Sequence, residues 1–444
     1  MALTGLDIYK LLPKTNCREC GFATCLAFAM ALAQKKISLD KCPKITAQAR
    51  SALESASQPP IKLVTIGTGD KKIEIGNEMV MYRHEQKFHH PAAIGFLIED
   101  TSAAVEIEKA VSEINAVRFE RVGQMLSANL VCVRNSSGSK DRFIDVVKKV
   151  AAGTDLCVAI ESRDACAAAE AAKVVKDRRP LLVCDAAAEA AEFARIAKES
   201  NIPIAVTVSS LEEAAGITDK IKKLGVEEIV LNLKDKSLPE RMQGFAYARR
   251  LALKKDLRAL GYPFLVFATQ TEPVLELAEA VSYVMKYAGL VIMNNRNKEF
   301  LFPLLVARQD VYQDPQKPVQ VEPRIYEIGK VTKESPVIVT TNFSITYFTV
   351  AGEVESSKVP SYIIACDSEG MSVLTAWAAE KFTAETIAGT LKKLGVEDIV
   401  FHKKVIIPGY VSILSGKLEE VSGWRVSVGP REASGIPAYL RNWK

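Results

Sequence analysis

The sequence predicts a mixed α/β protein with a small helical N-terminal module, a central (β/α)8 TIM barrel and a C-terminal Rossmann-like, doubly wound domain. Three observations predict it: clustered cysteines near the N-terminus, eight apolar runs alternating with helical stretches, and a second α/β pattern after a proline-containing segment. At 444 residues the chain is too long for one ordinary domain. The expected divisions are a cysteine module at 1–57, a linker at 58–91, the barrel at 92–325 and the last domain at 326–444.

The cysteine module is defined by Cys17, Cys20, Cys25 and Cys42, in the spacing C-x2-C-x4-C-x16-C. Three thiolates in one short loop, with a fourth about one helix-length away, suit the four soft ligands of a [4Fe–4S] cluster. Gly21 allows the backbone to turn tightly beside such a cluster. The spacing therefore predicts an iron–sulfur centre that handles electrons.

Two other uses of these cysteines stay open from spacing alone. A structural zinc site more often has two C-x2-C pairs, and this stretch has one. Disulfide bonds are disfavoured because no secretory segment is recognisable. The other five cysteines mostly lie in apolar runs, as small buried hydrophobic residues do: Cys132, Cys157, Cys166, Cys184 and Cys366.

Around the cysteines, helices are expected at Asp7–Leu12, Cys25–Lys36 and Ile45–Ala56, followed by a linker at Gln58–Pro60. Strand-like patches follow at Lys62–Gly67 and Lys72–Ile75. The histidine-containing run Tyr82–His90 is interpreted as a solvated connecting segment.

The central region carries eight strand candidates, at Ala93–Ile98, Asn129–Val133, Leu156–Ile160, Pro180–Cys184, Ile204–Val208, Glu228–Leu233, Phe264–Ala268 and Leu290–Met293. The stretches between them, such as Asp164–Lys176, Ala186–Ser200, Ser210–Leu224 and Pro273–Tyr287, have a helical pattern. Continuous Val/Ile/Leu strands alternating with helices indicate a parallel sheet buried on both faces. Eight such units match a closed barrel better than an open sheet.

In the last domain, strands are expected at Val337–Thr340, Ile345–Val350, Tyr362–Cys366, Asp398–Ile407 and Arg425–Val428. Helices are expected at Ser372–Lys381, Ala384–Leu394 and Ser412–Val421. This order is typical of a small doubly wound sheet.

Charge and hydropathy exclude two classes of partner. The net charge of +5 is small and is not gathered into a basic block, so nucleic acid is not expected. No stretch of about 18 apolar residues is present, so no membrane segment is expected and a cytoplasmic location is predicted.

Three polar loops of the last domain suggest a ligand crevice: Asp367–Val373, Thr340–Asn342 with Thr346 nearby, and Gly429–Gly435. Gly370 before a helix with Ser372 as N-cap presents free backbone N–H groups, which suit an anionic group at the carboxyl edge of a sheet. The lone His402 has no acid two residues before it and no glycine three residues after it, so it is interpreted as an ordinary histidine.

Polar residues also end the predicted barrel strands: Asp100, Arg134, Glu161, Asp185, Asn232, Gln270 and Asn294. Barrel enzymes place their catalytic groups at this edge. No Schiff-base lysine setting, histidine pair or metal triad stands out among these residues, so they are interpreted as a solvated rim and no catalytic residue is predicted.

With these motifs in place, the chain resembles the large (gamma) subunit family of the corrinoid iron–sulfur protein of the acetyl-CoA (Wood–Ljungdahl) pathway, which includes acetyl-CoA decarbonylase/synthase gamma subunits of archaea. The resemblance rests on N-C-R-E-C-G-F-A-T-C with Cys42, on the barrel and on the last α/β domain, and it covers essentially the whole chain.

The resemblance implies a methyl carrier of anaerobic carbon fixation. It implies a [4Fe–4S] cluster on Cys17, Cys20, Cys25 and Cys42, and a base-off cobamide without a histidine ligand in the C-terminal domain. Cobamide contacts are expected at Thr340, Thr346, Gly370, Met371, Ser372, Val373 and Ala433. The implied partners are a homologous small subunit in a heterodimer, a methyltetrahydrofolate methyltransferase, and acetyl-CoA synthase/CO dehydrogenase.

In the function so implied, a methyltransferase moves a methyl group from methyltetrahydrofolate onto cob(I)amide, the chain passes it to acetyl-CoA synthase, and the cluster reduces Co(II) back to Co(I). Two rivals remain. The barrel itself can be a pterin-dependent methyltransferase, with Asp100, Asp185 and Asn232 as pterin contacts, or the chain can be a simple iron–sulfur electron-transfer subunit.

Overall fold

The computed structural model describes residues 5–33, 37, 41–46, 49, 59–234 and 236–443. By their contacts the residues form two compact units: Met1–Arg118 with Ser127–Tyr312, and Phe119–Leu126 with Gln313–Lys444. The cysteine module contains helices α1 (Gly5–Leu11) and α2 (Cys25–Ala33). The expected helix at Ile45–Ala56 falls mostly outside the described residues, as does part of the Gln58–Pro60 linker.

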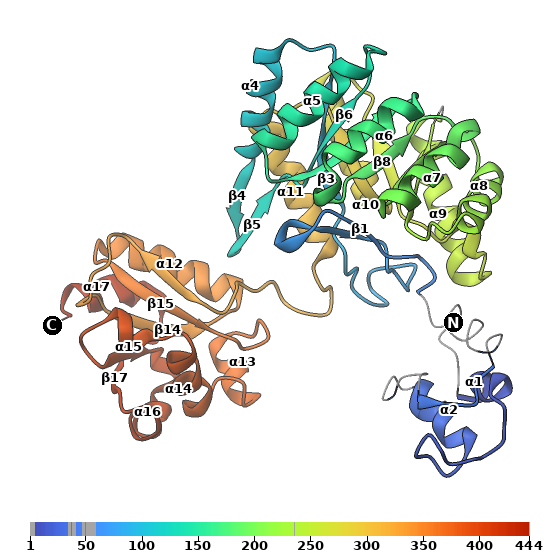
Figure 1. The fold of residues 1–444 in the computed structure, drawn as a ribbon. Helices are drawn as coiled ribbons and strands as arrows, with labels where there is room; N and C mark the ends of the chain where they lie inside the picture. The colour runs from blue at the N-terminus through green and yellow to red at the C-terminus, as the bar shows by residue number, and fades with distance from the viewer. Residues whose placement is uncertain are drawn as a thin grey trace. The chain divides into compact units, whose positions relative to one another are not determined.

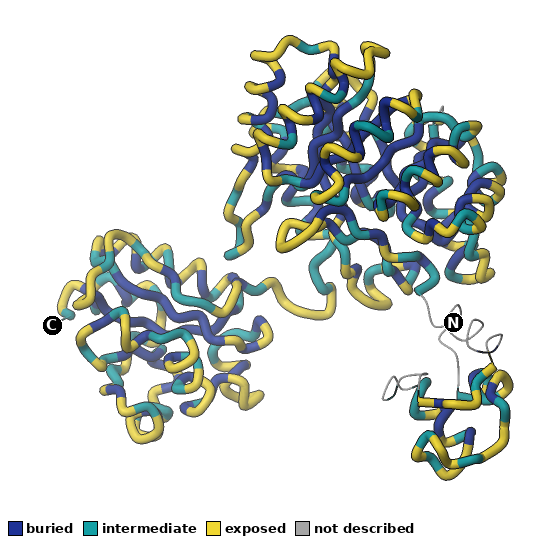
Figure 2. Tube along the Cα trace, in the orientation of Figure 1, coloured by how far each residue is buried: buried dark blue, intermediate teal, exposed yellow. Residues whose placement is uncertain are grey.

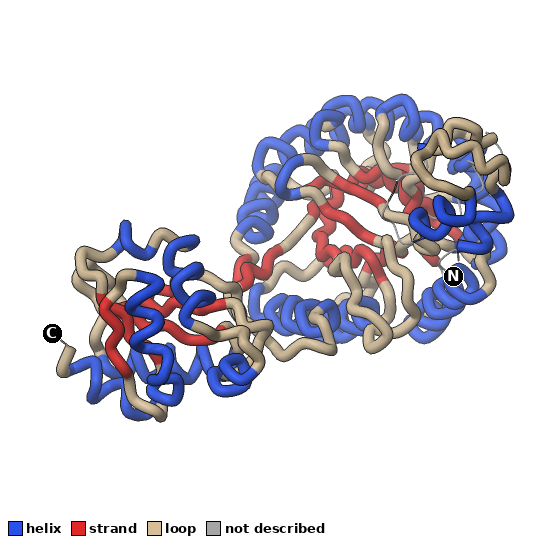
Figure 3. Tube along the Cα trace, turned by 90° about the horizontal axis from the view of Figure 1, so that it is seen from below, coloured by secondary structure: helices blue, strands red, loops and turns tan. Residues whose placement is uncertain are grey.

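The first unit contains a closed barrel of parallel strands, as predicted (Figure 3). All eight expected strands are present, in the spatial order β10-β11-β12-β3-β6-β7-β8-β9. Their bounds are β3 (Ala93–Glu99), β6 (Leu130–Arg134), β7 (Cys157–Ser162), β8 (Leu181–Cys184), β9 (Ile204–Val208), β10 (Ile229–Leu233), β11 (Phe264–Phe267) and β12 (Ala288–Met293).

A helix follows each barrel strand and packs outside the ring (Figures 1 and 3). These helices are α4 (Ala104–Asn115), α5 (Lys140–Gly153), α6 (Ala165–Val174), α7 (Ala190–Ser200), α8 (Leu211–Lys223), α9 (Leu238–Lys254), α10 (Pro273–Met285) and α11 (Lys298–Tyr312). Side-chain caps define several starts: Ser139, Asp164 and Ser210 accept hydrogen bonds from backbone N–H groups of α5, α6 and α8.

The barrel interior is a packed hydrocarbon core rather than a pore. Alternate residues of each strand point inward, so the inner rows are made of residues such as Ala159, Leu181 and Val183, all fully buried. Figure 2 shows the strands of the barrel as buried segments, in dark blue.

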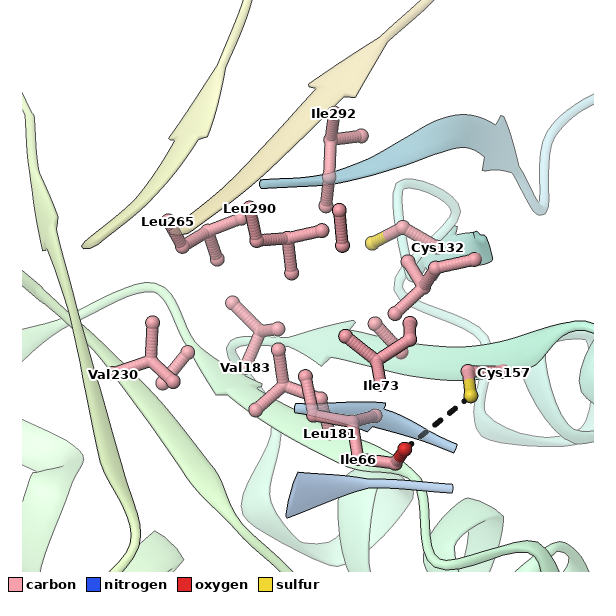
Figure 4. Close-up of a cluster of buried hydrophobic side chains, with 14 of the residues drawn as sticks. Ile66, Ile73, Cys132, Cys157, Leu181, Val183, Val230, Leu265, Leu290 and Ile292 are labelled. Atoms are coloured by element: carbon pink, nitrogen blue, oxygen red, sulfur yellow. Dashed lines mark hydrogen bonds between the residues drawn. The ribbon is translucent and has the colours of Figure 1, made fainter. Parts of the chain in front are cut away.

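A short antiparallel hairpin, β1 (Val64–Ile66) and β2 (Ile73–Ile75), packs against this core from the amino-terminal end of the strands. Its apolar side chains join the same cluster as Cys157 and Leu181, which lie at the starts of β7 and β8 (Figure 4). The Cys157 thiol donates a hydrogen bond to the Ile66 carbonyl at 3.4 Å. The segment that the sequence predicts to be a linker therefore closes the bottom of the barrel.

Arg249 of α9 anchors the chain that follows the hairpin. Its guanidinium donates to the Val80 carbonyl at 3.0 and 2.6 Å and to Glu78 at 3.5 Å. It also lies 4.7 Å from the ring centre of Phe88 and 4.5 Å from that of Tyr287. These contacts satisfy a buried cation with both hydrogen bonds and aromatic faces.

The second unit is built on a five-stranded sheet of order β13-β15-β14-β16-β17, in which only β13 is antiparallel. The strands are β13 (Ile325–Ile328), β14 (Val337–Thr341), β15 (Ser361–Cys366), β16 (Lys404–Ile407) and β17 (Arg425–Val428). The helices are α12 (Ser344–Ser357), α13 (Val373–Ala378), α14 (Ala384–Lys393), α15 (Val396–Ile399), α16 (Ser415–Ser422) and α17 (Ile436–Arg441), with 3-10 turns η6 (Gly409–Leu414) and η7 (Ala433–Gly435).

Separate hydrophobic cores cover the two faces of this sheet. One contains residues of α12 and α17, and the other contains residues of α13, α14 and α16. The sheet is therefore buried on both sides, as its continuous apolar strands indicate.

Several local predictions in this unit are wrong. The run Ile345–Val350, predicted as a strand, is part of helix α12. Its β-branched and aromatic residues favour a strand, but its buried residues recur at helical spacing against the sheet. The predicted strand at Asp398–Ile407 is reduced to β16, because Val396–Ile399 forms the short helix α15.

Two further elements were not predicted. The edge strand β13 pairs with β15. The hairpin of β4 (Arg118–Arg121) and β5 (Gln124–Ser127) lies between α4 and β6 in the chain. Its turn packs within the second unit, where Val122 joins the α12 core and Glu120 pairs with Arg324 at 2.5 Å.

Replacing Ile66 with alanine is expected to destabilise the barrel. The substitution leaves a cavity between the hairpin and the inner rows, which costs about 2–5 kcal/mol for a large aliphatic residue. Urea unfolding of the full chain measures the change. Leu63→Ala, at a 36% exposed position just before β1, is the matched control and should change stability by about 0.5 kcal/mol or less. Equal effects of the two variants would show that the hairpin does not contribute to the core.

Candidate functional site

The four cysteines of the first module lie on α2 and the loops around it. Cys25 begins α2 and is buried, as is Cys42, whereas Cys17 and Cys20 are half-buried. Asn16 fixes one turn of the loop, because its side-chain oxygen accepts the Cys25 N–H at 2.7 Å and its own N–H donates to the Cys25 sulfur at 3.4 Å.

The loop that carries Cys20 turns at Gly21, which has a φ of +84° and donates its N–H to the Arg18 carbonyl at 2.9 Å. A side chain would be strained in this left-handed conformation. The glycine predicted to permit a tight turn does so.

Electrostatics indicate that the four thiols share one small region. The pKa of Cys42 is raised, first by burial and then by repulsion from Cys20, Cys25 and Cys17, and the backbone N–H of Lys44 opposes the rise. Each of the other three cysteines disfavours ionisation of Cys42. Four thiolates at this site would therefore need a positively charged metal group to stabilise them. The donor set therefore fits an iron–sulfur cluster.

Within the described part of the chain, no group of three or more His, Cys, Asp or Glu side chains is arranged to hold a single metal ion.

In the second unit, Asn342 organises the loops after β14 and β15. Its side-chain oxygen accepts three hydrogen bonds: from the Ser368 N–H at 2.9 Å, the Ser368 hydroxyl at 2.8 Å and the Gly370 N–H at 3.1 Å. Its amide nitrogen donates to Gln320 at 3.0 Å and to Asp367 at 3.4 Å. Because Asn342 is only 1% exposed, one buried side chain shapes the whole edge.

Gly370 is required at this edge. Its φ is +73°, and a Cβ there would lie 2.9 Å from the Pro318 carbonyl oxygen. Ser372 takes the N-cap position of α13, as predicted. Its hydroxyl, however, pairs with the Thr375 hydroxyl at 2.9 Å and caps no backbone N–H.

Two threonine hydroxyls at the end of β14 have no hydrogen-bond partner. The Oγ1 atoms of Thr340 and Thr341 are both buried and unpaired. Buried polar groups are almost always satisfied in folded proteins, so these two orphans fit a bound group at the carboxyl end of the sheet.

The structure places the remaining predicted contacts around the same strands. Met371 and Val373 pack against the α14 core, and Ala433 packs against the α12 core on the other face. Thr346 lies in the first turn of α12, half-buried. β14 lies between β15 and β16 in the sheet. After β14 the chain continues to α12 on one face of the sheet, and after β16 it continues to α16 on the other face. In doubly wound sheets, ligands bind at the carboxyl ends of two neighbouring strands whose connections diverge in this way.

Sequence reasoning missed the exposed apolar residues near this edge. Leu374 and Trp377 of α13 are 45% and 40% exposed, and Tyr410 and Ile413 of the adjoining η6 are 45% and 75% exposed. Apolar side chains grouped in this way mark a surface that meets a ligand or a partner. No periodic signal in the sequence distinguishes them from core residues.

His402 is engaged within the fold, as predicted. Its Nε2 lies 2.9 Å from the Ser335 carbonyl oxygen, and its Nδ1 accepts the Lys404 N–H at 3.3 Å. Both ring nitrogens are used, so the side chain has none left for a metal.

The barrel rim holds a second candidate site, a cavity of about 680 Å³ lined by Arg134, Glu161, Asp185, Asn232 and other polar residues. Asp100, also proposed from sequence, serves a different purpose. It is fully buried and accepts hydrogen bonds from Ser136 N–H and from Ser137 N–H and hydroxyl at 2.5–2.8 Å, which fix the loop after β6. Gln270 and Asn294 bond to glutamates of α10.

Glu161 and Asp185, two of the carboxylates that line the cavity, have pKa values shifted in opposite directions. Burial raises the pKa of Glu161, and Arg134, 2.7 Å away, only partly offsets this. Burial also acts on Asp185, but hydrogen bonds from Lys234 and Arg163 outweigh it and hold the pKa of Asp185 below its ordinary value.

Comparison with known proteins shows which family the chain is similar to. A sequence profile described as "CO dehydrogenase/acetyl-CoA synthase delta subunit" matches residues 63–440, and one described as "Putative Fe-S cluster" matches residues 12–44. The "Corrinoid/iron-sulfur protein large subunit" of Moorella thermoacetica is 45% identical over 441 residues, 99% of each chain. The chain belongs to this family. Its recognition from the cysteine motif, the barrel and the last domain is confirmed.

Other relatives extend the family to archaea. The "Acetyl-CoA decarbonylase/synthase complex subunit gamma" of Methanothermobacter thermautotrophicus is 34% identical over 453 residues, 99% of each chain. Among solved structures, dihydropteroate synthase from Thermus thermophilus is similar at 16% identity and a TM-score of 0.40, over 55% of this chain and 98% of that one. The helices of the described residues include none long and apolar enough to span a membrane.

Replacing Asn342 with alanine is expected to loosen the edge between β14 and β15. The variant leaves buried donors of Ser368 and Gly370 unpaired, at a cost of about 1–3 kcal/mol for each buried group. Hydrogen exchange of residues 367–373, followed by mass spectrometry, should show clear loss of protection. Asn442→Ala, which removes one side-chain hydrogen bond on α17, is the control. Unchanged protection in Asn342→Ala would contradict the organising role.

Proposed function

We propose that the chain is a methyl-group carrier of the acetyl-CoA pathway, with a [4Fe–4S] cluster in its first module and a cobamide at the C-terminal sheet edge. The observation that carries the proposal is the full-length identity of 45% to a corrinoid/iron-sulfur protein large subunit. The four-thiol module and the two orphaned threonine hydroxyls support it, because each fits one of these groups.

Cys17, Cys20, Cys25 and Cys42 would bind the cluster. When assembled, the cluster supplies the electron that returns accidentally formed Co(II) to Co(I). Cys17 and Cys20 are half-buried, so they would hold the cluster within reach of a protein reductant.

We further propose that the C-terminal unit is a Rossmann-like, doubly wound cobamide-binding domain. Thr340, Thr346, Gly370, Met371, Ser372, Val373 and Ala433 would contact the group. When bound, the cobamide supplies a nucleophilic Co(I) that receives the methyl group of methyltetrahydrofolate through a methyltransferase and yields it to acetyl-CoA synthase. The engaged ring of His402 supports a base-off form without a histidine ligand.

The exposed apolar residues on α13 and η6 support a partner at this edge, and we propose the homologous small subunit of a heterodimer. We retain the division into 1–57, 58–91, 92–325 and 326–444 as a proposal, although residues 313–325 group by contacts with the second unit. The barrel then acts as scaffold and docking surface, in a cytoplasmic protein.

Cys42→Ala tests the role of the cluster. The variant should still bind cobamide and accept a methyl group onto chemically prepared Co(I), because the two sites lie in separate modules. It should fail to recover from Co(II) when a protein reductant is supplied, and ultraviolet–visible spectra follow both states. Cys166→Ala, at an exposed cysteine on α6, is the control. Reactivation of Cys42→Ala at the wild-type rate would refute the assigned role.

Rim substitutions test the scaffold role of the barrel against catalysis by it. Asp185→Asn and Asn232→Ala should leave the rate of methyl transfer nearly unchanged, whereas loss of a catalytic group typically costs about 10²–10⁴-fold. Asp100→Asn should lower the free energy of unfolding by about 1–3 kcal/mol yet leave the folded protein's rate unchanged, because Asp100 only holds a loop. A hundredfold loss in any variant with both cofactors intact would make the barrel an enzyme.

A further inference from the structure

The side chains that line the rim cavity stand on the same inward-facing rows as the apolar core of the barrel, but they are mostly polar. Residues two apart on a strand point to the same side. Cys132, Ala159 and Val183 belong to the inner core, and the residues two positions further along are Arg134, Glu161 and Asp185, which line the cavity. The same step occurs from Val230 to Asn232 and from Leu265 to Phe267.

The volume of about 680 Å³ is that of a metabolite site, since such pockets measure roughly 300–1,000 Å³. It opens at the carboxyl end of the strands, where barrel proteins bind their ligands. The proposed methyl-carrier function assigns no ligand to it.

Three of the four carboxylates that line the cavity are already hydrogen-bonded, and the fourth, Glu99, lies 3.8 Å from Arg134. One oxygen of Glu161 accepts from Arg134 at 2.7 Å. Both oxygens of Asp185 are engaged, by Lys234 at 2.7 Å and by Arg163 at 2.8 Å. Asp164 caps helix α6. The acceptors that remain are chiefly the Glu99 carboxylate, which faces the Arg134 cation, and the second oxygen of Glu161.

The cationic groups, in contrast, retain unused donors. Lys234 has three N–H groups and directs one at Asp185. Arg134 bonds Glu161 through Nε, and its terminal nitrogen lies 3.8 Å from Glu99, beyond hydrogen-bond distance. The Nε of Arg241 is buried without a partner.

Arg134 is also held in a fixed orientation. Its guanidinium carbon lies 4.9 Å from the ring centre of Phe267, so the ring supports the planar cation from one side while Glu161 holds its Nε. A cation positioned before the ligand arrives loses little side-chain entropy on binding.

We propose that this cavity binds an organic anion of metabolite size, whose carboxylate or phosphate oxygens accept hydrogen bonds from Arg134, Lys234 and Arg241. The excess of donors over free acceptors selects a ligand rich in acceptors, and guanidinium groups match both oxyanions. Asn232 adds one neutral amide, which donates to Thr207 at 3.1 Å through its nitrogen and keeps its oxygen for the remainder of the ligand.

Isothermal titration of the full-length protein, with its cofactors bound, tests the proposal. Inorganic phosphate and succinate are titrated separately at constant ionic strength, because salt screens exposed charges. Saturable binding with one site per chain is expected for at least one probe. The tighter probe tells whether a phosphate or a carboxylate is the preferred group.

Lys234→Met removes one donor cation and should weaken binding at least about tenfold, which corresponds to about 1.4 kcal/mol. Lys71→Met is the matched control. Lys71 is 50% exposed and pairs with Asp155 at 3.0 Å, and Lys234 is similarly 41% exposed and pairs with Asp185. Lys71, however, follows β1 at the amino-terminal end of the barrel, away from the cavity. Binding to Lys71→Met should be unchanged.

A second variant guards against misfolding. Arg134→Gln together with Glu161→Gln removes the buried ion pair as a neutral unit, so that no charge is left unpaired. It too should lose binding by at least about tenfold. No saturable heat with either probe, or equal affinity in wild type and Lys234→Met, would overturn the proposal and leave the rim as a solvated network of ion pairs.

Discussion

The constraint on which the barrel depends is the two-residue repeat of its inward-facing side chains. Closure of eight strands into a ring leaves no room for water in the lower rows, so residues such as Ala159 and Leu181 must be apolar and tightly packed. The β1–β2 hairpin completes this core from below. Polar inward residues are tolerated only at the other end, which is why the charged cavity lies there and nowhere else in the described barrel interior.

A similar logic governs the C-terminal sheet. Buried polar groups are costly unless they are bonded, and Asn342 meets this demand by accepting three hydrogen bonds and donating two. The same edge leaves Thr340 and Thr341 unsatisfied. The Asn342 side chain is thus fully engaged in shaping this edge, whereas the two threonine hydroxyls take no part in it.

The cysteine module, the barrel and the last sheet each have a hydrophobic core of their own. The cysteine module contains its own small hydrophobic cluster around Phe28, which packs with Cys25 and Cys42, so the thiols are supported locally. The barrel and the last sheet have distinct cores. Each of the three parts is therefore packed around a hydrophobic cluster of its own.

The sequence by itself determined the cysteine motif, the eight barrel strands and most strands of the last domain. These signals are local: ligand spacing and runs of apolar residues report directly on chemistry and burial. Tertiary structure decided the rest. Ile345–Val350 became helical because α12 packs its buried residues onto the sheet. The roles of Asn342 and Asp100, the closure of the barrel by β1–β2, and the convergence of Arg134, Lys234 and Arg241 on one cavity depend on contacts between residues far apart in the chain, which no local pattern encodes.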